Sequence, residues 1–162
     1  MMKERYDLKI ISEFDDKNPY QSAILTQEMC NIINPIKNRL NPKTAVFAIF
    51  SQVPLSSYSK NKAKVIEYLK QVIPKDGLYS EFKNNSKGKE IEMELIFFLA
   101  EDYEKRDVDN FIKIITDSLI GIWYEDDGQI KKIIAEKQKV TNMEIGINPK
   151  LYEQIYCSVK IL

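Results

Sequence analysis

The chain has 162 residues, a length typical of one globular domain. Its composition, 44% hydrophobic and 30% charged with five Gly and six Pro, excludes collagen-like, low-complexity and wholly disordered proteins. The 24 basic and 24 acidic side chains give a formal net charge of zero, whereas a nucleic-acid-binding protein usually carries a basic excess.

The first expected element is a strand at residues 6–14, which ends at a polar turn over residues 15–19. Ser22 is then expected to cap a helix that continues to about residue 40. Pro35 is expected to kink or end this helix, because proline has no amide hydrogen to donate.

The middle of the chain alternates between strands and helices. Residues 45–53 form a β-rich run, and residues 59–73 have apolar side chains at helical spacing with lysines on the other side. A polar loop is expected at residues 84–88. Residues 90–99 begin with strict alternation and end as an apolar run, which predicts a strand that becomes buried.

The C-terminal part predicts an amphipathic helix at residues 107–120, ended by Gly121. Residues 122–124 and 129–138 are expected to be strands on either side of a turn, and residues 154–161 form the last strand. Because helices and strands mix without strict βαβ alternation, we expect an α+β fold, with a mixed β-sheet and packed helices.

Several absences narrow the possible chemistry. The longest apolar run has six residues, too short to cross a bilayer, and the charged N-terminus does not resemble a signal peptide, so no membrane partner is expected. Cys30 and Cys157 are expected to be free thiols in a reducing cytoplasm. The chain has no histidine, which excludes histidine-dependent catalysis and histidine-ligated zinc. Oxygen-rich sites built from the remaining residue types select cations such as Mg²⁺ or Mn²⁺.

The zero net charge is a cancellation of two opposite blocks. Residues 60–89 contain eight lysines and three acids, a net charge of +5, whereas residues 92–127 contain eleven acids and three bases, a net charge of −8. A basic surface beside an acidic pocket suits a bound polyanion and a bound cation. The alternative is that these charges are solvated faces of unrelated elements.

The acidic block contains a regular arrangement of side chains. Asp107 and Asp109 lie at a helix start, and Asp109, Lys113 and Asp117 share one helical face. A further pair at residues 126–127 follows at a turn that can return beside the helix start. Carboxylates about 4 Å apart repel by roughly 1–4 kcal/mol, and a divalent cation relieves that repulsion.

Each of these acids also has an ordinary structural explanation. Asp107 can be a helix N-cap, Asp109 can favour the helix dipole, and residues 127–128 can form a hairpin turn. The aromatic pair Trp123 and Tyr124 is expected to be part of the core rather than a wedge that separates bases.

The combined pattern resembles the signature of a known family. From Asp107 the chain reads Asp-x-Asp-Asn-x-x-Lys-x-x-x-Asp, followed by Leu-x-Gly and by Asp-Asp-x-Gln-Ile from Asp126. This resembles the RusA-like Holliday junction resolvases. The resemblance covers about residues 45–162 as a RusA-like endonuclease core, and leaves residues 1–44 as an N-terminal extension of unknown function.

The resemblance implies a Mg²⁺-dependent endonuclease, with Mn²⁺ as an alternative, that works as a homodimer on four-way DNA junctions in recombination and repair. It assigns metal binding to Asp107, Asp109 and Asp127, and the essential lysine to Lys113. A bound divalent ion provides hydroxide near neutral pH without any histidine.

Further residues are assigned supporting or DNA-binding roles. Motif positions with supporting roles are Asn110, Asp117 and Asp126, of which Asp117 is placed to orient Lys113 from one turn away. The lysines expected to hold DNA through its phosphates are Lys60, Lys62, Lys64, Lys83, Lys87 and Lys89. Two alternatives stay open: a non-catalytic junction-binding dimer, and a nuclease of the same chemistry that cuts other branched DNA.

Overall fold

The computed structural model describes residues 24–51, 53 and 62–162. At its centre is a four-stranded sheet in the order β1-β4-β2-β3. Strand β4 is antiparallel to both of its neighbours, and β3 is parallel to β2. The strands are β1 (Ala45–Ser51), β2 (Ile91–Leu99), β3 (Ile130–Lys139) and β4 (Gln154–Ile161). The mixed sheet with its packed helices confirms the expected α+β class.

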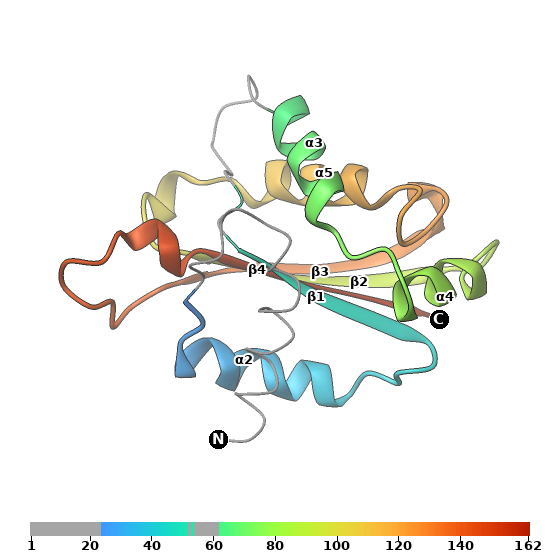
Figure 1. The fold of residues 1–162 in the computed structure, drawn as a ribbon, viewed down its shortest axis with the longest axis horizontal. Helices are drawn as coiled ribbons and strands as arrows, with labels where there is room; N and C mark the ends of the chain where they lie inside the picture. The colour runs from blue at the N-terminus through green and yellow to red at the C-terminus, as the bar shows by residue number, and fades with distance from the viewer. Residues whose placement is uncertain (1–23, 52, 54–61) are drawn as a thin grey trace.

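Helices lie on both faces of this sheet (Figure 1). Helices α3 and α5 cover one face and α2 covers the other, while α4 lies near the end of the sheet where β2 begins (Figure 1). The helices are α2 (Gln27–Asn38), α3 (Lys62–Val72), α4 (Leu78–Asn85) and α5 (Val108–Leu119). Short 3₁₀ turns are η2 (Tyr103–Lys105), η3 (Asp127–Gln129) and η4 (Pro149–Tyr152). None of the helices in the described ranges could cross a membrane.

The main core lies between β2 and α5. Side chains alternate along a strand, so Met93, Leu95 and Phe97 point to the same face of β2, and all three are fully buried. The rings of Phe97 and Phe111 on α5 lie 5.3 Å apart between centroids. Since α5 turns its apolar side to the sheet, its polar side, which carries Asp109, is exposed.

The second core lies under α2, whose buried Met29 and Ile33 pack with Ile96 on β2. The helix begins later than expected: the N-cap is Thr26, whose Oγ1 accepts from the Met29 amide at 3.2 Å, and the proposed cap Ser22 lies outside the described residues. Pro35 lies inside α2 without ending it.

Two other local expectations were wrong. Residues 122–124 were expected to be a strand but form a turn after α5, with a single isolated bridge between Ile120 and Tyr124. Helix α4 was not expected, and its last residues overlap the loop expected at 84–88. By contrast, the last strand has the expected bounds. The strand expected at residues 6–14 lies outside the described part of the chain.

Candidate active site

The first acidic residues lie at the start of α5. Asp107 is the N-cap of the helix, and its Oδ1 accepts a hydrogen bond from the Asp109 amide at 3.0 Å. This bond satisfies one of the amides that a helix start leaves unpaired. It also fixes the two residues relative to each other, so the capping explanation of Asp107 is confirmed.

The loop that leads into α5 is held by a buried ion pair. Arg106 is 8% exposed and donates to Oε2 of Glu153, which is 11% exposed. The same Oε2 accepts from the Ala100 amide at 2.9 Å. On the other side of the loop, Lys137 Nζ donates to the carbonyls of Tyr103 and Arg106 at 2.6 and 3.1 Å. These contacts hold the residues before Asp107 against β3 and against Glu153, which directly precedes β4.

The exposed side of α5 carries the expected row of charged residues. Asp109, Asn110 and Lys113 are exposed, and Asp117 is half-buried. Asp117 forms an ion pair with Lys62 on α3, at 3.5 Å, rather than with Lys113. Asp117 therefore joins α5 to α3.

After α5 the chain forms a turn, and two buried aromatic side chains hold this turn in place. Gly121 has φ 81°, a left-handed conformation that other residues rarely adopt. Trp123 Nε1 donates to the Pro74 carbonyl at 2.9 Å, and the Tyr124 hydroxyl donates to the Thr116 carbonyl at 2.7 Å. Both aromatic side chains are fully buried, which confirms that they are core residues.

The second acidic pair follows this anchor. Residues 127–129 form the 3₁₀ turn η3 rather than the hairpin turn considered from the sequence. Gln129 fixes the turn, because its Oε1 accepts from the Glu125 and Asp126 amides at 2.9 and 3.2 Å. Its Nε2 donates to the Ser86 and Lys89 carbonyls at 2.7 and 3.0 Å. The turn is thereby joined to the loop after α4.

Crowding of acidic groups perturbs the second of these two aspartates. The pKa of Asp127 is raised, first by a hydrogen bond with the Asp126 carboxyl, then by partial loss of solvation and by repulsion from Asp126 and Asp117. The Gly128 amide opposes this shift. Negative charge therefore accumulates at the end of α5 and in η3, where a bound cation would be favourable.

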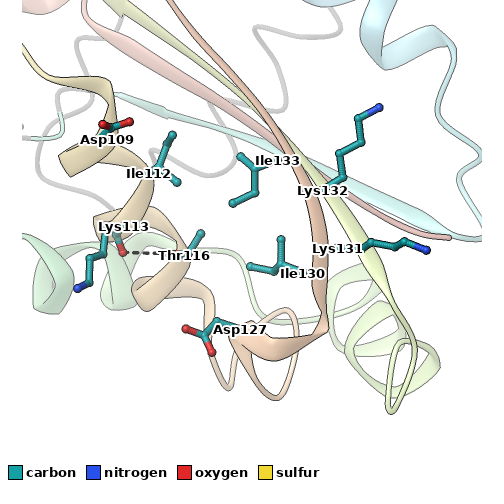
Figure 2. Close-up of a pocket in the computed structure, with 9 residues that line it drawn as sticks. All are labelled: Asp109, Ile112, Lys113, Thr116, Asp127, Ile130, Lys131, Lys132 and Ile133. Carbon is teal, nitrogen blue, oxygen red and sulfur yellow. Dashed lines mark hydrogen bonds between the residues drawn. The ribbon is translucent and has the colours of Figure 1, made fainter.

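A pocket of about 520 Å³ lies between α5 and β3. Figure 2 shows Asp109 at one end and Asp127 at the other, with isoleucine side chains between them. The lining residues are Asp109, Ile112, Lys113, Thr116, Asp127, Ile130, Lys131, Lys132 and Ile133. In Figure 2 the ammonium group of Lys113 points to the side of α5 away from β3. Asp107 lies next to the pocket, at the helix start, and is not one of its lining residues.

The donor atoms suit a hard divalent cation, since both acids on the pocket supply carboxylate oxygens. Within the described ranges, no three carboxylates, thiols or imidazoles lie close enough together to form a metal-binding group. The chemical identity of Asp109 and Asp127 thus fits Mg²⁺ or Mn²⁺, and the structure brings these two acids to one pocket without a third.

The expected DNA-binding lysines within the described residues form two groups near this region, one on α3 and one on α4 and the loop after it. Lys62 and Lys64 lie on α3, which packs against α5. Lys83 lies on α4 and is followed in the next loop by Lys87 and Lys89; Lys60 lies outside the described residues. Lys87 Nζ lies 3.7 Å from the Glu125 carboxylate, next to η3.

Two basic residues that line the pocket were not predicted from the sequence. Lys131 and Lys132 line it at the start of β3. They could have been identified from the sequence, because they directly follow the Asp-Asp-x-Gln-Ile motif in the chain.

Comparison with known proteins agrees with the sequence motif. Residues 58–148 match the family model described as "Endodeoxyribonuclease RusA". This segment is more than half of the chain and contains α3, α4, β2, α5 and β3, including both pairs of aspartates. None of the curated proteins matches the chain. The match to the family model confirms the resemblance inferred from the motif: the chain belongs to the RusA endodeoxyribonuclease family.

Proposed function

We propose that this protein is a Mg²⁺-dependent endonuclease of the cytoplasm that resolves Holliday junctions by paired symmetric nicks in recombination and repair. The observation that supports it most is the pocket shared by Asp109, Lys113 and Asp127 in a chain of the RusA family. Acidic groups from two separate segments line this pocket together with a lysine, and carboxylates are the ligands that metal-assisted phosphodiester hydrolysis uses.

Asp109 and Asp127 would supply carboxylate oxygens to the metal, with Asp107 as a further oxygen donor from the helix start. When bound, Mg²⁺ would supply Lewis-acid polarisation of the scissile phosphate and a lowered pKa of an attacking water. The mutual repulsion of the acids around Asp127 favours a cation at this place.

The other motif residues would support these groups. Lys113 lies one turn after Asp109, so its ammonium group can stabilise negative charge on a phosphate oxygen near that carboxylate. Asp126 raises the negative charge at η3, and Asn110 presents a neutral donor beside Asp109. Asp117 would act by holding Lys62, and with it α3, against α5.

The substrate would lie across the pocket, held on both sides by lysines. Lys62 on α3 pairs with Asp117, and Lys87 in the loop after α4 lies beside Glu125, so both groups of lysines border the acidic region. We assign the DNA arms to these two groups, in which Lys60, Lys62 and Lys64 form one and Lys83, Lys87 and Lys89 the other. Phosphate contacts of this kind recognise shape and charge rather than sequence.

A homodimer suits this substrate. A four-way junction has approximate two-fold symmetry, and two nicks at matched positions are needed to resolve it. An isologous dimer presents two identical pockets related by the same symmetry.

The proposal is tested by incubating the protein with a synthetic mobile four-way junction and with linear duplex, with Mg²⁺ and with EDTA. We expect paired symmetric nicks in the junction, none in the duplex, and none with EDTA. Junction binding without nicks in either Mg²⁺ or Mn²⁺ would indicate the non-catalytic junction-binding dimer. Faster cutting of flaps or forks than of four-way junctions would indicate a nuclease of the same chemistry with another substrate.

Asp109→Asn tests the site within the same assay. Because the variant removes a charged metal donor, we expect cleavage to fall at least about 100-fold while junction binding is retained. Asp102→Asn is the matched control, since Asp102 is exposed and lies outside the pocket. This variant should cleave the junction as the wild type does. Wild-type cleavage by Asp109→Asn would show that the nuclease site lies elsewhere.

A further inference from the structure

Gln129 uses both ends of its side-chain amide to join two segments of the chain. Its Oε1 accepts from two successive amides, those of Glu125 and Asp126. Its Nε2 donates to the carbonyls of Ser86 and Lys89, which lie 43 and 40 residues earlier in the chain. All four bonds are between 2.7 and 3.2 Å, within the range of good hydrogen bonds.

The loop at the other end of these bonds is itself firmly anchored. Ser86 is fully buried, and its amide bonds to the Phe82 carbonyl at the end of α4. The Lys89 amide bonds in turn to the Ser86 carbonyl at 3.0 Å. The Nε2 end of Gln129 therefore contacts a fixed backbone, while its Oε1 end holds an exposed turn of acidic residues.

This connection matters because the acids of the turn repel one another. Asp126 and Asp127 are adjacent and exposed, and their carboxylates repel each other when both are ionised. The two Gln129 bonds on the Oε1 side fix the backbone directly before Asp127. The two bonds on the Nε2 side fix that backbone relative to the loop that carries Lys87 and Lys89.

We propose that Gln129 is a positioning residue: it holds Asp127 in place to bind the divalent metal ion by joining η3 to the basic loop at 86–89. This inference rests on the proposed function and deepens it. Gln129 itself lies outside the pocket and acts only through the turn. The loop at 86–89, proposed to bind DNA, and the Asp127 carboxylate, proposed to bind the metal, are then held in a fixed relative position by Gln129.

Two substitutions distinguish the contributions of the Oε1 and Nε2 ends of the Gln129 side-chain amide. Gln129→Glu keeps an oxygen to accept from the Glu125 and Asp126 amides and loses the donor to Ser86 and Lys89. Gln129→Met has a similar length and loses both sets of bonds. An added carboxylate would by itself attract a cation, so weaker metal binding by Gln129→Glu reports the lost connection rather than the new charge.

The first measurement is Mn²⁺ affinity of the DNA-free protein by calorimetry. We expect Gln129→Glu to bind roughly tenfold more weakly, as for other residues that orient metal ligands, and Gln129→Met more weakly still. Hydrogen exchange at the Glu125 and Asp126 amides should be faster in Gln129→Met than in Gln129→Glu. Gln138→Glu is the control, since Gln138 lies near the end of β3, far along the strand from η3, and its side-chain amide donates locally to Glu136, at 2.9 Å.

The second measurement is junction nicking as a function of Mg²⁺ concentration. Gln129→Glu should need roughly tenfold more Mg²⁺ for half-maximal nicking and should recover the wild-type rate at saturating Mg²⁺. Unchanged metal affinity in Gln129→Glu would overturn the proposal, and so would a rate that no Mg²⁺ concentration restores, or a wild-type protein that binds no Mn²⁺. If the wild type binds Mn²⁺ but nicks no DNA, the proposed function fails, and the affinities of the two variants still decide the role of Gln129.

Discussion

A single carboxylate, that of Glu153, organises the entrance to the candidate active site. Its Oε2 accepts from Arg106, from the Ala100 amide at 2.9 Å and from the Glu101 amide at 3.4 Å. The Arg106 guanidinium also lies over the ring of Phe111, 5.5 Å from its centroid. Because Arg106 directly precedes Asp107, this buried pair fixes the backbone from which the first candidate metal donors project.

Removing the charge of Glu153 should therefore be costly. In Glu153→Gln the Arg106 guanidinium stays buried without an opposite charge, and we expect the free energy of unfolding to fall by about 3–5 kcal/mol. Urea denaturation followed by circular dichroism measures this change. Glu104→Gln is the control, because its pair with Lys139 is largely exposed and should contribute about 0–1 kcal/mol. A loss below that of the control would mean that the Arg106–Glu153 pair does not stabilise the loop.

The site could be predicted from the sequence only where it depends on local spacing. Asp109 and Lys113 share a helix face because they are four residues apart, and that was predicted. The ion-pair partner of Asp117 was not predicted, because Lys62 belongs to another helix and lies 55 positions earlier in the sequence. Gln129 could be placed in a motif, but its bonds to the loop after α4 depend on tertiary packing that no periodicity encodes.

Helix α2 lies outside the family match and yet contributes to the core. Its residues precede the matched segment 58–148. Ile33 is 1% exposed and packs with Ile96 and Phe98 on the face of the sheet opposite α5. The helix thus covers apolar strand residues that would otherwise face water.

Ile33→Ala tests whether α2 is an integral part of the fold. Truncation of a fully buried isoleucine leaves a cavity, and we expect a loss of about 2–5 kcal/mol in the free energy of unfolding. Ile145→Ala is the control, because Ile145 is fully exposed and should change stability by less than about 0.5 kcal/mol. Thermal and urea unfolding of the two variants give the comparison. A loss in Ile33→Ala as small as that of the control would show that α2 is not packed on the sheet in solution.

The same contrast between local and tertiary signals explains which elements could be predicted. Strand β4 has the expected bounds because a turn precedes a run rich in β-branched and aromatic residues. Helix α4 was missed because it has only eight residues and a single buried residue, Phe82, so it has hardly any periodicity. Residues 122–124 have strand-forming side chains, but the bonds of Trp123 and Tyr124 to distant carbonyls fix them in a turn.

At the scale of the whole molecule, β3 is an edge of the sheet. It pairs with β2, and no other described strand pairs with its outer side. Ile133 and Ile134 are 38% and 40% exposed, and they point to opposite faces of the strand. We place the interface of the proposed homodimer at this edge. An antiparallel pairing centred on Ile134 would put Lys132 opposite Glu136 of the partner subunit, a favourable cross-strand pair.

Ile134→Lys should therefore separate the subunits. Two lysines facing each other at the centre of the paired strands would repel, and each would replace an apolar contact. Light scattering should give twice the chain mass of 18.9 kDa for the wild type and for Ile145→Lys, whose substitution lies on an exposed loop, and 18.9 kDa for Ile134→Lys. The separated subunits should nick junctions singly, since paired nicks need two linked sites. A dimeric Ile134→Lys variant would place the interface on another surface, and a monomeric wild type would exclude the homodimer.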